Sequence, residues 1–209
     1  MPQFKLPDSP AVWVMAGDTI TQGARHTYGA RCWVEHVHER VRYQLGRFFD
    51  LVVNSGLFNG TAAELLENFD PLIGRFNPQL VSLSLGTWDC LEGEAGLTAF
   101  EGSMRRLIEK SLHLQATVIV QTPALVMRSA APNLRHLSAY AATLRALAAE
   151  YDCNLVDHEA YWQSRFGEAE PIKWMDDDVH PNAVGHLYMA QAMFSALEMG
   201  RIRETFLLA

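Results

Sequence analysis

The chain has 209 residues, of which 49% are hydrophobic and 20% are charged, so it is long enough for one sizeable core and short for two. We therefore expect a single domain over residues 1–209. The formal net charge of -7 argues against nucleic acid or an anionic membrane as a partner, because both would repel the protein at long range. A small molecule or a saccharide is the partner that this charge favours.

We expect neither a signal peptide nor a membrane-spanning segment. No stretch approaches the roughly 18 apolar residues of a membrane span. Pro2, Pro7 and Asp8 interrupt the N-terminal segment where a signal peptide needs a continuous apolar run. The three cysteines are an odd number at scattered spacing, which suits buried thiols in a reducing compartment: Cys32, Cys90 and Cys153. We expect a cytoplasmic protein.

Apolar runs of strand length alternate with segments of helical periodicity along the chain. The expected strands are 11–16, 50–54, 79–85, 116–121 and 153–157, and the expected helices are 30–47, 62–69, 98–114, 133–151 and 182–199. The strands are nearly continuous apolar runs, as in parallel sheets that are covered on both faces. This alternation predicts an α/β fold, a doubly wound three-layer α/β/α sandwich of the flavodoxin-like kind, with a central parallel sheet of about five strands.

Two local patterns support the expected helices. The segment 133–151 carries an apolar stripe of the kind that a helix lays on a sheet, formed by Leu134, Leu137, Ala141, Leu144 and Ala148. Thr61 with Glu64, and Thr98 with Glu101, have the spacing of a capping box, which starts a helix.

Polar residues follow three of the expected strands. Gly17-Asp18-Thr19 comes after the first, Asn54-Ser55-Gly56 after the second, and Gly86-Thr87-Trp88-Asp89 after the third. The loop before the last helix contains Asp176 to His180. Ligands bind at the carboxyl ends of the strands in such sheets, so these segments should share one rim. A hydroxyl, backbone amides beside glycines, and a histidine near carboxylates indicate an acyl-transfer site.

The order of these motifs resembles the SGNH, or GDSL-type, hydrolase family, whose pattern is G-D-S, N-x-G, G-x-N-D and D-x-x-H. The resemblance extends from about Val12 to His186 and ends on the family-like string H-P-N-A-V-G-H. It implies an α/β/α sandwich that hydrolyses esters, often by removing acetyl or other acyl groups from sugars or lipids. It implies no metal and no organic cofactor. The alternative elbow motif of α/β esterases, G-x-S-x-G, does not occur.

The resemblance assigns catalytic roles to three residues: Thr19 as the nucleophile, His180 as its base, and Asp177 as the carboxylate that orients the base. Asp176 and Asp178 are alternatives for the carboxylate. Threonine replaces the family's serine, and its extra methyl group restricts χ1 and crowds the attacked carbonyl. We therefore expect weakened catalysis on a small acyl group.

The resemblance places the oxyanion hole at the backbone amides of Thr19 and Gly56. Trp88 stands where the family has an asparagine that donates a further hydrogen bond, and its indole N–H is a doubtful substitute. The expected pocket residues are Asp18, Asn54, Asp89 and His26.

Each of these residues also has a purely structural interpretation. Thr19 fits a helix cap and Asp89 a cap of the next segment. Asn54 fits a loop that is held by side-chain hydrogen bonds. Packing roles suit the others: Trp88, Cys90 and His186.

Two functions therefore remain open from the sequence. The first is a small-acyl esterase, and the second is a non-catalytic protein of the SGNH fold that binds a carbohydrate or an acylated metabolite. The apolar tail 205–209 suits either a homodimer contact or packing on its own sheet.

Overall fold

A central sheet of five parallel strands organises the protein in the computed structural model, which describes residues 4–5 and 8–199. The strands are β1 (Val12–Gly17), β2 (Leu51–Gly56), β3 (Leu80–Ser84), β4 (Thr117–Gln121) and β5 (Asn154–Val156). Their order across the sheet is β2-β1-β3-β4-β5, so the chain winds outward in both directions from β1 and β3. The fold class expected from the sequence is confirmed.

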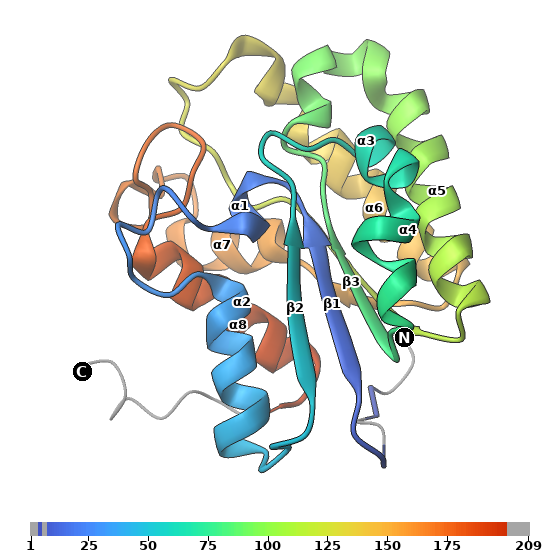
Figure 1. Cartoon of the computed structure of the whole chain (residues 1–209). Coiled ribbons are helices and arrows are strands. Elements are labelled where there is room, and N and C mark those ends of the chain that lie inside the picture. The colour runs from blue at the N-terminus through green and yellow to red at the C-terminus, as the bar shows by residue number, and fades with distance from the viewer. Residues whose placement is uncertain (1–3, 6–7, 200–209) are drawn as a thin grey trace.

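Helices cover both faces of the sheet (Figure 1). One face carries α2 (Trp33–Glu39), α7 (His158–Phe166) and α8 (Ala183–Ala196). The other carries α3 (Ala62–Glu67), α4 (Phe69–Leu72), α5 (Leu97–His113) and α6 (Leu137–Glu150). Each face has its own apolar core, and the expected stripe of Leu134, Leu137, Ala141, Leu144 and Ala148 is buried in the second.

Three α-helices are shorter in the structure than the sequence predicts. The expected helix 30–47 is α2 followed by a π-helical turn, η1 (Arg40–Gln44), and the expected helix 62–69 ends at Glu67, before α4 starts. The helix expected at 133–151 begins as a 3-10 segment, η4 (Pro132–His136), and α6 follows from Leu137.

Several short elements are not predicted from the sequence. They are α1 (Thr19–Gln22), α7, and the 3-10 segments η2 (Gly74–Phe76), η3 (Asp89–Gly96) and η5 (Ile172–Trp174). A cap signal for α7 exists, because the Asp157 side chain accepts a hydrogen bond from the Ala160 amide at its start.

The two expected capping boxes have different outcomes. Thr61 and Glu64 form the box that begins α3. The box at Thr98 is wrong, because η3 runs directly into α5 and Gly96 already has helical backbone angles ahead of Leu97. A cap needs an extended residue before the helix, and none precedes α5.

Other expectations from composition concern the surface and the thiols. All three cysteines are free and buried. Within residues 4–5 and 8–199, no helix is both long and apolar enough to cross a membrane.

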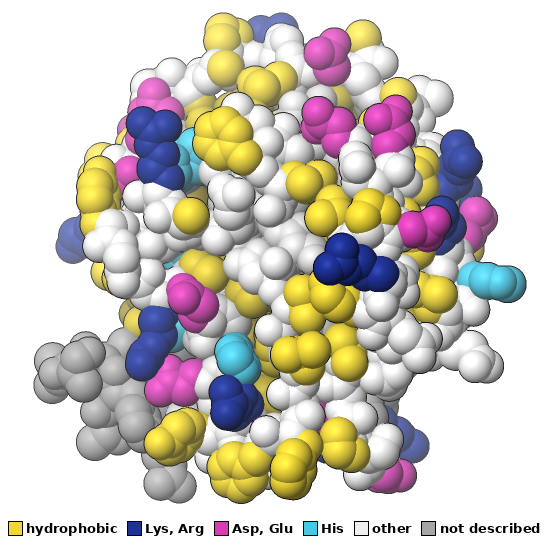
Figure 2. Space-filling model, in the orientation of Figure 1, with side chains coloured by type: hydrophobic (Ala, Val, Ile, Leu, Met, Phe, Trp, Pro, Cys, Tyr) yellow, Lys and Arg dark blue, Asp and Glu magenta, His cyan; other side chains and the backbone are white. Residues whose placement is uncertain are grey.

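Figure 2 shows hydrophobic side chains along the lower edge of one face, around the turn between η1 and β2, where Tyr43, Phe48, Phe49 and Leu51 are exposed. The tail 205–209 lies outside the described residues.

Candidate active site

The carboxyl ends of β1, β2 and β3 form the floor of the site, and α1 lies directly against them (Figure 1). A Cβ atom on Gly56 would stand 2.2 Å from the Gln22 backbone nitrogen, and one on Gly17 would stand 2.4 Å from the Ser84 carbonyl oxygen. Only glycine allows this approach of backbone to backbone. The motif glycines therefore place Thr19 immediately above the end of β1.

Asp18, not Thr19, caps α1. Its side chain accepts a hydrogen bond of 2.9 Å from the Ile20 amide, and its backbone is extended. Thr19 is thus the first helical residue, and the interpretation of its hydroxyl as a cap is wrong. The Thr19 amide lies in the first turn of a helix, where amides lack an intrahelical acceptor.

The Thr19 hydroxyl is held by Asn59, which sequence reasoning missed. The Asn59 backbone amide donates to Thr19 Oγ1 at 2.6 Å, and Oγ1 donates to the Asn59 side-chain oxygen at 3.2 Å. Asn59 has a φ of 53°, a left-handed conformation that asparagine tolerates better than most residues. The Asn59-Gly60 dipeptide, a common turn signal, is the feature of the sequence that could have revealed this contact.

The expected role of Gly56 as an amide donor is contradicted by its contacts. Its N–H donates to the Asn54 side-chain oxygen at 3.0 Å. The Asn54 amide group in turn donates to the Thr21 carbonyl at 2.9 Å, so Asn54 fastens β2 to α1 as its structural interpretation predicted. The backbone amide that lies next to the Thr19 hydroxyl is that of Asn59.

Asp177 and His180 form a hydrogen-bonded pair. The His180 Nδ1 atom lies 3.0 and 2.8 Å from the two Asp177 carboxylate oxygens, and one of these oxygens also accepts the His180 backbone amide at 2.7 Å. Burial acts to raise the pKa of Asp177, but these hydrogen bonds outweigh it and hold the pKa below its ordinary value. Burial lowers the pKa of His180, and Asp177 opposes only part of that effect. His180 is therefore a neutral base near pH 7.

The base nitrogen of His180 has no partner. Its Nε2 atom is buried and makes no hydrogen bond within the described chain, and the same is true of the indole nitrogen of Trp88. The two rings are neighbours, with centroids 5.7 Å apart. Trp88 therefore packs against the base, and no hydrogen bond joins Thr19 to His180 in this conformation. A buried polar atom without a hydrogen-bond partner costs free energy. A ligand group that hydrogen-bonds to the His180 and Trp88 nitrogens would remove this cost.

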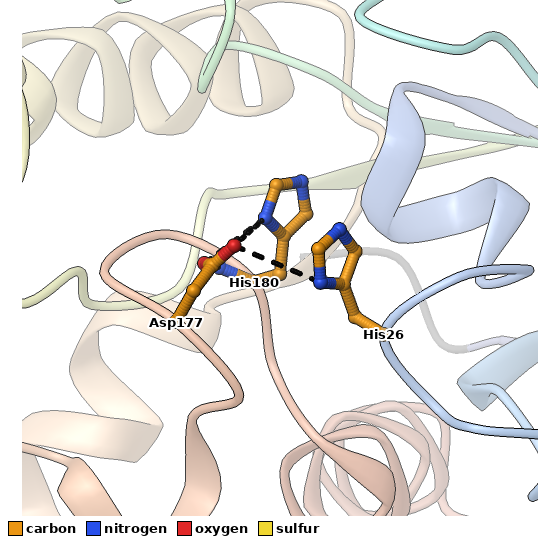
Figure 3. Close-up of side chains that lie close together, drawn as sticks. All are labelled: His26, Asp177 and His180. Carbon is orange, nitrogen blue, oxygen red and sulfur yellow. Dashed lines mark hydrogen bonds and ion pairs between the residues drawn. The ribbon is translucent and has the colours of Figure 1, made fainter.

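A second histidine, His26, lies beside His180, and Figure 3 shows both rings next to Asp177. His26 comes from the loop after α1, and its Nδ1 atom is 2.8 Å from Asp176 and 3.6 Å from Asp177. The His26 and His180 rings are stacked, with centroids 3.6 Å apart and planes 6° apart. His26 therefore lines the site, as expected.

The two stacked imidazoles and Asp177 bring three potential metal-ligand atoms within 4.8 Å of one another. The lone pairs of an imidazole lie in the ring plane, however, and the two planes here run side by side rather than converge. This arrangement suits two separate aspartate–histidine pairs better than one shared ion.

Asp89 accepts hydrogen bonds from the amides of Ala62 and Gly86, at 2.8 and 3.1 Å. It thus caps the start of α3 rather than the segment that follows it, which corrects the structural interpretation. Burial raises the pKa of Asp18 to about 7 and that of Asp89 to about 6. These two expected pocket residues are buried behind the rim rather than exposed on it.

Cys90 and His186 have the structural roles that were expected. The Cys90 side chain is fully buried, and burial raises the pKa of its thiol to about 11, so it is no thiolate nucleophile. His186 is buried in α8 and accepts a hydrogen bond from the Trp33 amide.

A family model described as GDSL-like lipase/acylhydrolase matches residues 15–187. An acetylxylan esterase from Geobacillus stearothermophilus is 24% identical over 162 residues, which cover 73% of this chain and 74% of that protein.

Solved structures agree on the fold. The acetylxylan esterase Axe2 from the same organism aligns with a TM-score of 0.77 and 24% identity over 93% of this chain and 98% of that one. LAE5, an alpha/beta hydrolase enzyme from the metagenome of Lake Arreo, aligns with a TM-score of 0.78 and 19% identity over 90% and 95%. Alanine variants at a serine, an aspartate and a histidine of Axe2 are described as catalytic mutants, and that aspartate and histidine are three positions apart.

Proposed function

We propose that this chain, which belongs to the GDSL-like lipase/acylhydrolase family, removes a small acyl group, such as acetyl, from a carbohydrate ester. As a member of this family it is a hydrolase that acts on ester bonds. The acetylxylan esterases among its relatives support a saccharide substrate. The observation that carries the proposal is the buried Thr19 hydroxyl at the end of β1, on the rim that also bears the Asp177–His180 pair.

The proposed reaction begins at Thr19. Its Oγ1 attacks the acyl carbon while His180 Nε2 takes the hydroxyl proton, and Asp177 holds the opposite ring nitrogen. The saccharide oxygen leaves with that proton, which produces an acylated threonine. Water, deprotonated by His180 Nε2, then attacks the acyl-threonine carbonyl. The C–Oγ1 bond breaks, the protonated His180 returns the proton to Thr19 Oγ1, and the carboxylic acid is released. The spacing of Asp177 and His180 equals that of the catalytic aspartate and histidine of Axe2, which supports these roles.

We assign the stabilisation of the negative charge that develops on the acyl oxygen to the Thr19 and Asn59 amides. The Asn59 amide donates to Thr19 Oγ1 before the reaction and shifts to the acyl oxygen as Oγ1 becomes bonded to the acyl carbon. Both are backbone donors, so they do not depend on the replaced signature residues. The unpaired indole N–H of Trp88 is the third candidate donor, because an acyl oxygen would give this buried group the partner that it lacks. The indole leaves little room beside His180, which favours a small acyl group.

The first test is turnover of an activated acetyl ester by the purified protein and by its His180→Ala variant. General base catalysis is typically worth about 100- to 10,000-fold, so the variant should lose at least the lower figure. Exposed His113 provides the matched control through His113→Ala, which should keep full turnover. Acetylated xylo-oligosaccharides then test the saccharide assignment. Equal rates for His180→Ala and the unmodified protein would contradict the proposal.

One observation favours the second candidate, a protein that binds an acylated saccharide without cleaving it. The Thr19 hydroxyl donates to Asn59 rather than to His180, so the nucleophile and the base are not yet coupled. Binding measured by calorimetry, with no product released, would favour this candidate.

The proposal also includes the cellular location and the oligomeric state of the protein. Three free thiols suit a reducing compartment, which supports the cytoplasm as the location. The proposed chemistry needs only one chain, and light scattering of the purified protein tests the homodimer.

A further inference from the structure

His26 is the one histidine of the described chain that stacks on the base, and the family motifs of the sequence do not include it. Its ring lies parallel to that of His180 within 6°, and Asp176 fixes it by a 2.8 Å contact to Nδ1. Its side chain is 16% exposed and that of Asp176 is 18% exposed, so solvent only partly screens the contact.

Asp177 alone leaves one rotation of the His180 ring unrestrained. A carboxylate that holds Nδ1 fixes the direction of the N–H bond, but the imidazole can still rotate about that direction. A second flat ring stacked on it removes this rotation, because twisting would break the face-to-face contact. Trp88 cannot replace this restraint, since its plane is tilted by 44° and its centroid is 5.7 Å away.

The stack also couples the charges of the two rings. In the reaction proposed above, His180 gains a proton when the hydroxyl is deprotonated, and its positive charge then faces the His26 ring. A positive charge on His26 would lie 3.6 Å from that of His180, measured between ring centroids, and the two charges would repel strongly. The charge of the His26 ring therefore affects how readily His180 accepts a proton.

We propose that His26, held by Asp176, is a positioning residue that fixes the plane of the His180 ring and sets the pH range in which His180 acts as a base. The inference rests on the proposed catalytic role of His180. His26 itself touches no reacting atom in this account.

The groups that surround this pair determine how the proposal can be tested. The charged or titratable residues that act on this pair or on the groups around it are Arg25, Tyr28, Asp176 and Asp177 from the two loops, His36 from α2 and His186 from α8. After burial and Asp177, the next influences on the pKa of His180 are His26, which lowers it, and Asp176, which raises it. Removing His26 should therefore raise the pKa of His180, and removing the charge of Asp176 should lower it.

The experiment is an NMR titration of the His180 ring in the intact protein, which needs no turnover. His26→Phe keeps a flat ring that cannot carry a positive charge, so the pKa of His180 should rise. Asp176→Asn removes a negative charge, so this pKa should fall. His113→Phe makes the same substitution at an exposed histidine on α5 and should change nothing. An unchanged His180 titration in His26→Phe would overturn the proposal, and if that variant does not fold, an unchanged titration in Asp176→Asn would do so.

Turnover supplies the second measurement. The acid limb of the pH–rate profile should move to higher pH in His26→Phe and to lower pH in Asp176→Asn. His26→Ala, which loses the stack as well as the charge, should lower kcat by about 10-fold, a fraction of what general base catalysis contributes, and leave KM nearly unchanged. His26→Phe should recover most of this loss. If His26→Ala and His26→Phe are equally slow, the stack does not position the base. If the unmodified protein has no activity, the proposed function fails, and the NMR titration still decides whether His26 is coupled to His180.

Discussion

Asp18 and Asp89 lie behind the rim of the sheet, 2% and 7% exposed, whereas the Asp176 and Asp177 side chains on its outer edge are 18% and 46% exposed. The inner two bind backbone amides and have raised pKa values because they are buried. The outer two contact imidazoles, and hydrogen bonds hold the pKa of Asp177 below its ordinary value.

The contrast shows how surroundings divide one residue type between two tasks. The inner side chains hold backbone: Asp18 holds the start of α1, which carries Thr19, and Asp89 holds the amides of Ala62 and Gly86. The outer carboxylates orient the two imidazole rings. Changes to the inner pair should therefore alter stability, and changes to the outer pair should alter turnover. The variants that follow test this division of roles between the inner and the outer aspartates.

The largest effect is expected from Asp177→Asn. An amide cannot hold the tautomer of His180 that leaves Nε2 free to accept a proton, and this loss costs about 10,000-fold in kcat in a comparable triad. Asp178→Asn is the matched control, because the Asp178 carboxylate accepts a hydrogen bond from the Ser129 hydroxyl rather than from either histidine. This substitution should change turnover by no more than about twofold. Steady-state kinetics on an acetyl ester checks both variants, and equal losses would end the assignment of Asp177.

Asp18→Asn tests the inner pair through stability. The folded pKa of about 7 lies above the ordinary aspartate value of 3.8, so the folded state holds a proton that the unfolded state releases. The free energy of unfolding should therefore fall as pH rises between these values, by on the order of 4 kcal/mol in total.

Asparagine caps a helix as well as aspartate does, so Asp18→Asn should keep α1 and lose this part of the pH dependence. Urea unfolding at about pH 5 and about pH 8 provides the measurement. A variant whose stability depends on pH as strongly as that of the unmodified protein would show that Asp18 is not the group responsible.

The replaced signature residues predict a gain of activity. Thr19→Ser removes the methyl group that restricts the nucleophile, and Trp88→Asn supplies a side-chain donor of the size that the family uses. A missing oxyanion donor typically costs about 100- to 1,000-fold, so the double variant should gain up to that amount in kcat. Thr19→Ser with Trp88→Phe, which has no donor at position 88, should not gain it. Equal rates for the two double variants would exclude position 88 from the oxyanion hole.

Asn59→Gly should have the smallest effect. It removes the side-chain oxygen that competes with His180 for the Thr19 proton, keeps the backbone amide, and suits a φ of 53°. A hydrogen bond of about 1 kcal/mol corresponds to roughly a fivefold rise in kcat. Asn59→Ala removes the same oxygen but strains the backbone, so its kcat should rise less. A fall in kcat for Asn59→Gly would mean that the Asn59 side chain assists the reaction.

The sequence predicts the five strands because each is a continuous apolar run, and the structure places all of them within two residues of the expected bounds. The resemblance to the D-x-x-H motif selects Asp177 among three neighbouring aspartates, and the structure shows its contact with His180. The short helices α1 and α7 escape prediction because neither is long enough to show an apolar period.

The contacts of the site that remain hidden in the sequence are those between distant loops. Asn59 is 40 positions from Thr19, and His26 is 154 positions from His180. The backbone angles of Asn59 and the path of the loop after α1 create these contacts, and no spacing rule encodes either. The Gly56 contact is local instead: the Asn54 side chain, two positions earlier, accepts the hydrogen bond from the Gly56 amide.

The central claim is that Thr19 is a working nucleophile. Turnover of a small activated acetyl ester by the unmodified protein, measured beside its Thr19→Ala variant, tests it most directly, because the variant subtracts hydrolysis by other surface groups. Our account predicts saturable turnover that falls to background in Thr19→Ala. Equal rates in the two proteins would contradict it.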